Sequence, residues 1–236
     1  MQWIGHRGAR KEAPENTLGG FRYLRDLGLK AVEFDVRQLS DGTLIVIHDD
    51  SLLRTAGRAE SVHQLSADLL SETDHRVGWP DWPTPEPTPL LSEVMTLLAD
   101  FDHIEVELKA VMDDTAAMRL ISALSRLLTP WKNQITLTSF DLKILQAAQQ
   151  LAADFKRGLL IELPLPTSDI IDTAQRLGCT RVGMADRLTD HSVITGLREA
   201  GLACSVWTVN DQVRAQQLIT WGADGIITDV PAQMLR

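Results

Sequence analysis

From about residue 100 to residue 236, short apolar runs alternate with longer segments whose apolar residues recur at i, i+3 and i+4. This alternation is typical of β-strands that are each followed by an amphipathic helix, and it predicts a parallel sheet. The predicted strands cover residues 103–109, 134–139, 157–162, 180–184, 203–209 and 225–228. The predicted helices between them cover residues 113–128, 141–153, 168–177, 190–200 and 211–221.

The N-terminal part of the chain adds a strand, a helix and two further strands, at 2–5, 16–27, 31–36 and 43–48. Asp41-Gly42 separates the last two strands, and an Asp-Gly pair between two β-patterned runs is a strong hairpin signal. A parallel connection needs a dozen or more residues, so the 43–48 strand is predicted to return antiparallel. The remaining eight strands are enough for a closed barrel.

These strands predict an α/β fold, a TIM-type (β/α)8 barrel with a hairpin and an insertion after the second strand. The insertion covers about 50–89 and ends in a proline-rich run that suits neither a helix nor a central strand. Trp79 and Trp82, in that run, are predicted to pack the loop onto the barrel in preference to contacting substrate. A chain of 236 residues has the length of a single barrel, so 1–236 is predicted to form one domain.

Composition narrows the class of protein. Hydrophobic residues make up 44% and charged residues 23%, as in an ordinary globular protein, and the net charge of −9 argues against binding nucleic acid or anionic lipid. Cys179 and Cys204 lie in apolar runs and are predicted core residues. The N-terminus has no signal-peptide pattern, and no apolar run could span a bilayer. We expect a cytoplasmic protein without stable membrane association, and its oligomeric state stays open.

Ionisable residues lie at the predicted C-terminal ends of the first two strands, which is where β/α-barrel enzymes carry their catalytic groups. The first strand ends in His6 and Arg7. Glu33 and Asp35, two residues apart, share one face of the second barrel strand. If the hairpin has a two-residue turn, its register places Asp35 across from His48. Two carboxylates and an imidazole then share one small area.

The next barrel strand is predicted to carry Glu105, Glu107 and Lys109 on one face. Each group alone has a structural explanation: strand carboxylates are often solvated, a histidine can lie in the core, and Lys109 could neutralise Glu107. Together, these groups would repel one another or lose hydration unless a ligand or a cation organised them. Several carboxylates without nearby cysteines suit Mg²⁺ or Ca²⁺ better than zinc.

Short motifs follow one another along nearly the whole chain. They are His6-Arg7-Gly8, Pro14-Glu15-Asn16-Thr17, Glu33-Phe34-Asp35-Val36, Asp41-Gly42, Val46-Ile47-His48-Asp49, Glu107-Leu108-Lys109, Ser139-Phe140, Val206-Trp207-Thr208-Val209-Asn210 and Asp224-Gly225-Ile226-Ile227-Thr228-Asp229. In type and order they resemble the signature of the glycerophosphodiester phosphodiesterase family. The resemblance implies a TIM-type barrel, a divalent cation, Mg²⁺ or Ca²⁺, and hydrolysis of small glycerophosphodiesters to glycerol 3-phosphate and an alcohol.

The resemblance also implies roles for individual residues. The metal ligands would be Glu33, Asp35 and Glu107, the acid/base pair His6 and His48, the phosphate-binding residues Arg7 and Lys109, and the glycerol-pocket residue Trp207. Which histidine is the base stays open. So does the attacking group, which is either water or the substrate's own 2-hydroxyl through a cyclic phosphate.

The chain departs from the family pattern at two places. Glu105 stands where the family commonly has Asn, and of the usual Arg-Thr-Thr stretch after His48 only Leu53-Arg54-Thr55 is present. Two further motifs are predicted to be structural. Pro14 to Thr17 would begin the first helix, with Asn16 or Thr17 as its cap, and Thr228-Asp229 would close the barrel.

Other functions stay open beside this one. A lysophospholipase D-like lipid phosphodiesterase on the same scaffold would need an apolar entry. A non-catalytic phosphate-ester-binding barrel would need charge but not two imidazoles, and an isomerase- or aldolase-like barrel would need a lysine placed for a Schiff base. The insertion carries leucines spaced to pack a short helix against the barrel, at Leu52, Leu53, Leu65, Leu69 and Leu70. Leucines packed in this way leave no exposed apolar patch for docking on a lipid bilayer, so we expect water-soluble substrates.

Overall fold

The structure of the protein is a computed structural model, which describes residues 1–236 apart from the side chain at position 67. Its parallel strands are β1 (Gln2–His6), β2 (Ala31–Gln38), β4 (His103–Leu108), β5 (Ile135–Ser139), β6 (Lys156–Ile161), β7 (Arg181–Ala185), β8 (Ala203–Trp207) and β9 (Gly225–Thr228). Because β1 pairs with both β9 and β2, the sheet closes on itself. The predicted TIM-type barrel is confirmed.

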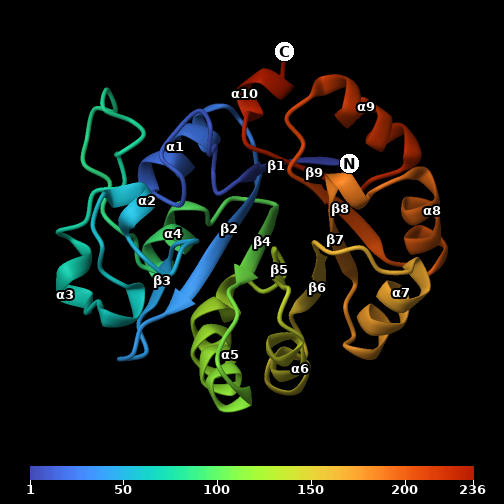
Figure 1. Cartoon of the computed structure of the whole chain (residues 1–236), viewed down its shortest axis with the longest axis horizontal. Helices are drawn as coiled ribbons and strands as arrows, with labels where there is room; N and C mark the ends of the chain where they lie inside the picture. The colour runs from blue at the N-terminus through green and yellow to red at the C-terminus, as the bar shows by residue number, and fades with distance from the viewer.

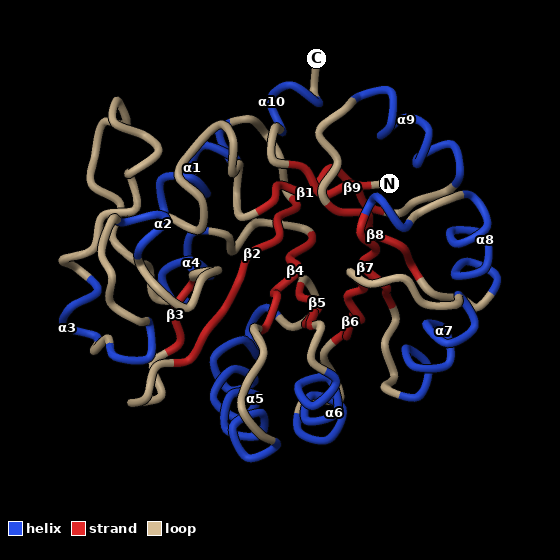
Figure 2. Tube along the Cα trace, viewed as in Figure 1, coloured by secondary structure: helices blue, strands red, loops and turns tan.

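Helices surround the barrel, and the strands occupy its centre (Figure 1, Figure 2). The predicted helices appear as α1 (Leu18–Asp26), α5 (Asp114–Leu128), α6 (Leu142–Leu151), α7 (Thr167–Arg176), α8 (His191–Glu199) and α9 (Gln212–Trp221). Three short elements, η2 (Thr129–Trp131), η3 (Asp186–Leu188) and α10 (Pro231–Met234), were not predicted. In the described part of the chain, no helix is long and apolar enough to cross a membrane.

Helix starts follow the local sequence. The side chains of Thr17, Asp113, Asp141, Asp190 and Asp211 each accept a hydrogen bond from a backbone N–H in the first turn of the helix that follows. Each cap contributes about 1 kcal/mol by satisfying an otherwise unpaired donor. Thr17, and not Asn16, therefore caps α1, which leaves the Asn16 side chain available for other contacts.

The hairpin forms as predicted, but its register differs by one residue. Strand β3 (Leu44–Val46) pairs antiparallel with the outer half of β2. The amide of Gly42 donates a hydrogen bond to the carbonyl of Leu39 (3.0 Å), and Gly42 takes the left-handed conformation (φ 94°). This extra turn residue shifts the pairing, so the amide of Ile47 donates to the carbonyl of Asp35 (3.0 Å). His48 consequently lies one position beyond the expected partner of Asp35.

The insertion is built from short pieces, α2 (Leu53–Ala56), η1 (Val62–Gln64) and α3 (Ala67–Leu70). The expectation that five leucines pack one helix is wrong, because Gly57 (φ 67°) ends α2 after one turn. Leu52, Leu65 and Leu70 are buried in a small separate cluster, whereas Leu53 is 60% exposed. The insertion has its own small core beside the barrel, at the left of Figure 1.

Helix α4 (Leu91–Leu97) follows the insertion and was not predicted, because the prolines before it obscure its apolar pattern. Leu91 packs into the main core, and α4 connects the insertion to β4. The anchoring role of Trp82 is confirmed, since its ring contacts Tyr23 of α1 at 6.4 Å between ring centroids. Its indole N–H also donates to Glu86 (2.9 Å), and Glu86 accepts from the amide of Gly19 (2.9 Å).

Candidate active site

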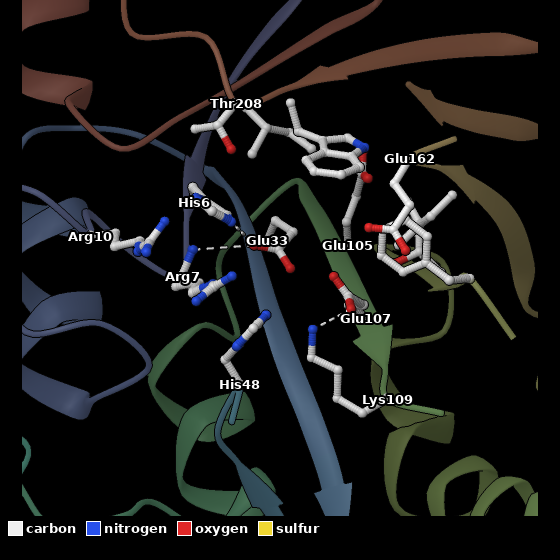
Figure 3. Close-up of a pocket in the computed structure, with 15 residues that line it drawn as sticks. His6, Arg7, Arg10, Glu33, His48, Glu105, Glu107, Lys109, Glu162 and Thr208 are labelled. Atoms are coloured by element: carbon white, nitrogen blue, oxygen red, sulfur yellow. Dashed lines mark hydrogen bonds and ion pairs between the residues drawn. The ribbon is translucent and has the colours of Figure 1, made fainter. Parts of the chain in front are cut away.

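Three acidic side chains meet where β2 and β4 lie side by side. The parallel register places Glu33 beside Glu105 and Asp35 beside Glu107. Glu33, Asp35 and Glu107 each offer a carboxylate oxygen, and these oxygens lie within 4.8 Å of one another. Glu33 and Glu107 reach into the same cavity, where Lys109 pairs with Glu107 (Figure 3). Oxygen ligands at this spacing suit a hard divalent cation.

The electrostatics of this triad also fit a cation. Burial and the neighbouring carboxylates raise the pKa of Glu33 well above its usual range, and burial and Asp35 raise the pKa of Glu107 to about 7. Burial opposes ionisation of Asp35 too, but Lys109 and Arg7 hold its pKa far below the usual range. Among the described residues, nothing donates a hydrogen bond to the buried Oε1 of Glu33. A bound cation would satisfy that oxygen and remove the repulsion.

His6 ends β1 and is held by a carboxylate from the last strand. Its Nδ1 lies 2.6 Å from Oδ1 of Asp229, and Asp229 is itself fixed by the Nδ2 of Asn210 (2.9 Å). This contact leaves Nε2 facing the cavity, 3.8 Å from Oε2 of Glu33. Burial lowers the pKa of His6, and the Asp229 hydrogen bond partly offsets that effect. His6 is therefore an oriented imidazole that can accept or donate a proton at Nε2.

His48 follows β3 and is held in a similar way from the other side. Its Nδ1 lies 2.7 Å from Oδ1 of Asp49. Arg37 donates from Nε (3.0 Å) and Nη2 (2.8 Å) to the His48 carbonyl, which fixes the backbone that carries the ring. Burial lowers the pKa of His48 while Asp35 opposes the effect. The one-residue register shift thus does not remove His48 from the site, because it still lines the same cavity as His6.

The loop after β1 is strained where it reaches the site. Arg7 (φ 50°) and Asn16 (φ 56°) both take the left-handed conformation, which is uncommon for residues other than glycine. Arg7 places its Nε 3.1 Å from Oδ2 of Asp35, and its amide donates to Oε2 of Glu33 (3.2 Å). Asn16 donates from Nδ2 to Oδ2 of Asp35 (2.8 Å). The strained loop therefore brings both side chains to the triad.

A network of ion pairs links the insertion to the site. Arg54 of α2 donates to both oxygens of Glu15 (2.7 Å each) and pairs with Asp49 (2.7 Å). Glu15 also accepts from Nη1 of Arg7 (2.9 Å). The two arginines overcome burial and lower the pKa of Glu15 to about 2. Arg54 thereby connects the carboxylate behind His48 to the loop that carries Arg7.

An aromatic wall closes the opposite side of the cavity. The rings of Phe140 and Trp207 meet edge to face, 5.6 Å apart and at 84°. Leu160 and the exposed Glu162 continue this wall. In Figure 3, the Glu162 carboxylate lies on the side of the cavity away from His6, Arg7 and Arg10. Trp207 thus lines the cavity that holds the charged groups, and this cavity has a volume of about 200 Å³.

Glu105 lies deeper in the barrel and makes its own contacts. It accepts from Nε2 of His103 (3.0 Å) and from the hydroxyl of Ser205 (3.3 Å), and Nη1 of Arg181 lies 3.6 Å away. Burial opposes its ionisation, but Arg181 and His103 lower its pKa. The extra acid is therefore neutralised within the barrel, at the floor of the cavity.

Of the predicted site residues, all except Asp35 line one cavity, and Asp35 pairs with Arg7 and Lys109 at its edge. The structure adds residues that the sequence reasoning had not assigned to the site. These are Glu15, Asn16, Arg37, Asp49, Arg54 and Asp229. A signal existed for Asp229, since it follows the end of β9 as His6 ends β1. The barrel rule applied to every strand would have selected it.

Comparison with known proteins agrees with this geometry. Residues 6–233 match the Glycerophosphoryl diester phosphodiesterase family. The chain is 28% identical to the glycerophosphodiester phosphodiesterase of Caldanaerobacter subterraneus subsp. tengcongensis over 98% of this chain and 95% of the relative. It is 25% identical to an Oleispira antarctica phosphodiesterase solved with the product sn-glycerol-3-phosphate, at a TM-score of 0.91, with 100% and 95% of the two chains covered. A putative glycerophosphoryl diester phosphodiesterase from Silicibacter pomeroyi gives 26% identity and a TM-score of 0.89 over 99% and 91% of the chains.

A barrel with acids, imidazoles and cationic side chains at its strand ends has the groups that phosphodiester hydrolysis requires, and the family match places the chain among the phosphodiester hydrolases. More specifically, the chain belongs to the glycerophosphoryl diester phosphodiesterase family. The resemblance predicted from the motifs is thus confirmed, and the hydrolysis of glycerophosphodiesters is the activity that this family defines.

Proposed function

We propose that this protein hydrolyses glycerophosphodiesters to glycerol 3-phosphate and an alcohol, with a divalent cation, Mg²⁺ or Ca²⁺, held by Glu33, Asp35 and Glu107. The observation that carries the proposal is the meeting of these three carboxylate oxygens within 4.8 Å, one of them on the buried and incompletely paired Glu33. When bound, the cation supplies positive charge that offsets the negative charge of the phosphoryl group.

The remaining roles follow from charge and proton transfer. Arg7 and Lys109 bind the phosphate oxygens as fixed cations. One of His6 and His48 takes the proton of the attacking hydroxyl, and the other donates a proton to the leaving oxygen. Asp229 stabilises the His6 ring, and Asp49 the His48 ring, whenever that ring carries a positive charge, because each carboxylate accepts a hydrogen bond from Nδ1. Trp207 lines the subsite for the glycerol moiety.

The direct test is release of glycerol 3-phosphate from glycerophosphocholine by the purified protein. The proposal predicts stoichiometric release of glycerol 3-phosphate and choline. Binding of glycerol 3-phosphate without any hydrolysis would instead support the non-catalytic barrel. The chain is further proposed to act as one domain over residues 1–236, and its cytoplasmic location stays a prediction that cell fractionation can test.

Substrate size gives a separate prediction. Exposed apolar residues at the barrel rim, Met112 (96%), Leu163 (67%) and Leu165 (54%), provide a specific reason to test lipids as well. The small charged cavity favours deacylated diesters, so we expect glycerophosphocholine and glycerophosphoethanolamine to be hydrolysed at least about tenfold faster than lysophosphatidylcholine at equal concentration. Faster hydrolysis of the lysophospholipid would favour the lysophospholipase D alternative.

The contact between Asp229 and His6 predicts a positioning effect. Asp229→Asn should lower kcat about 10- to 100-fold with little change in KM, because the neutral amide of Asn lacks the negative charge that stabilises the protonated ring. Steady-state kinetics on glycerophosphocholine measures this effect. Asp224→Asn offers a control on the same strand region, since Asp224 accepts from the amide of Cys204 (2.8 Å), away from the cavity. Equal losses in both variants would remove Asp229 from a positioning role.

A further inference from the structure

A second cavity adjoins the active site along the hairpin. It has a volume of about 690 Å³ and lies between the hairpin tip, residues 37–42, the loop at 109–112 and helix α5. Figure 1 shows the hairpin tip below β3 next to α5. Lys109 lines both this groove and the active-site cavity. The two spaces therefore meet at a residue that is proposed to bind phosphate.

The active-site cavity is small, which favours a second space for part of the substrate. Cavities that enclose drug-sized ligands have roughly 300–1,000 Å³. The active-site cavity has about 200 Å³, which suits one half of a diester better than the whole molecule. The Phe140 and Trp207 rings close one side of it. The groove that shares Lys109 with this cavity is the neighbouring space for the other half.

The charges of the groove indicate what that half carries. Lys109, Arg37 and Arg119 line it, whereas Asp41 at the hairpin tip is its one acidic residue among those described. Arg37 is engaged with the carbonyl of His48. Arg119 on α5 is exposed, and no ion pair in the described part of the chain includes it. It is the cation of the groove that is available to a ligand.

The floor of the groove is apolar and its mouth is open. Leu39 and Leu120 are buried beneath it, and Val111 is partly buried. Met112 stands at the mouth and is 96% exposed. A floor of this kind accepts the carbon atoms of an alcohol, while Arg119 can pair with a charged group at its end.

We propose that this groove binds the leaving alcohol of the substrate, and that it favours alcohols carrying an anionic group, such as a carboxylate, over those whose only charged group is cationic. The inference rests on the hydrolysis proposed above and adds a specificity to it. Arg119 is the specificity-determining residue, because it is the groove cation whose charge is not already engaged by the protein.

Charge reversal at Arg119 tests the groove. Arg119→Glu should lower kcat/KM for glycerophosphoserine, whose serine carries a carboxylate beside its ammonium group, and raise kcat/KM for glycerophosphocholine, whose choline is only cationic, so that the ratio of the two values falls about tenfold or more. Arg119→Ala should lower the same ratio by a smaller factor. Raising the ionic strength should weaken the effect, because the pair is exposed to solvent.

Arg126→Glu is the matched control. Arg126 lies on the same helix, two turns further on, and its guanidinium donates to Ser122 (2.9 Å) instead of lining the groove. The control makes the same change in net charge and should leave the ratio within about twofold of the wild-type value. Equal shifts in the Arg119→Glu and Arg126→Glu variants, or no shift in either, would overturn the groove as the leaving-alcohol site.

Failure of the groove and failure of the hydrolytic function give different results. If the wild-type enzyme hydrolyses both diesters and Arg119→Glu leaves their ratio unchanged, only the groove is refuted. If the wild-type protein hydrolyses neither, the hydrolytic function fails, and isothermal titration calorimetry decides the groove. Tighter binding of glycerophosphoserine than of glycerophosphocholine, reversed by Arg119→Glu, would then support it, and equal binding would refute it.

Discussion

Replacing either His6 or His48 with alanine is expected to lower kcat for glycerophosphocholine by about 100-fold or more, as removal of a general acid or base does. Both imidazoles line the active-site cavity. Each is oriented at Nδ1 by a carboxylate, at 2.6 Å for His6 and 2.7 Å for His48, so alanine removes an oriented proton carrier. Steady-state kinetics at saturating substrate and cation measures the loss.

The control for this experiment is His191→Ala. His191 is exposed at the start of α8, outside the residues that line the cavity, and packs against Trp221. Its replacement should leave kcat within about twofold of the wild-type value, because it contacts none of the reacting groups. Unchanged circular dichroism would show that the active-site variants keep their fold. A folded His6→Ala or His48→Ala enzyme with near-normal turnover would exclude that histidine from proton transfer.

Exhaustive removal of divalent cations with EDTA is expected to abolish hydrolysis, and Mg²⁺ or Ca²⁺ should restore it. Glu107→Gln should abolish the cation-dependent activity even at high cation concentration, because it removes a charged ligand from a triad whose oxygens lie within 4.8 Å. Direct calorimetric titration with each cation provides a second measurement, independent of turnover. Full turnover after EDTA dialysis would contradict the cation requirement.

Glu105→Gln is the matched control for Glu107→Gln, since the two residues share a strand and differ by one pleat. Glu105 already has protein partners in His103 and Arg181. Its replacement should reduce turnover less than about tenfold, but it should lower the free energy of unfolding by about 1–3 kcal/mol, because Arg181 loses a buried counter-charge. The opposite assignment of activity and stability effects would show that Glu105 belongs to the cation site.

Neighbouring strands show how far the sequence reasoning could go. Alternation along β2 was enough to place Glu33 and Asp35 on one face. The pairing of Asp35 beside Glu107 depends on the register between β2 and β4, which is set by packing around the closed barrel. At the hairpin, the pattern located the turn but missed its third residue, because a left-handed glycine after Asp suits both a two-residue and a three-residue turn and residue types alone do not choose between them.

The sequence by itself determined the barrel, the antiparallel hairpin and the set of charged residues at the strand ends, because period-2 and period-3.6 patterns and turn residues are local signals. His48 is supported by its sequence neighbour Asp49, but only the tertiary structure decided which group supports His6 and how the insertion is tied to the loop that carries Arg7. Asp229 reaches His6 across 223 positions of sequence, and Arg54 reaches Glu15 across 39. Such contacts arise when barrel closure brings the first and last strands together and when the insertion folds back over the rim, and no local pattern encodes them.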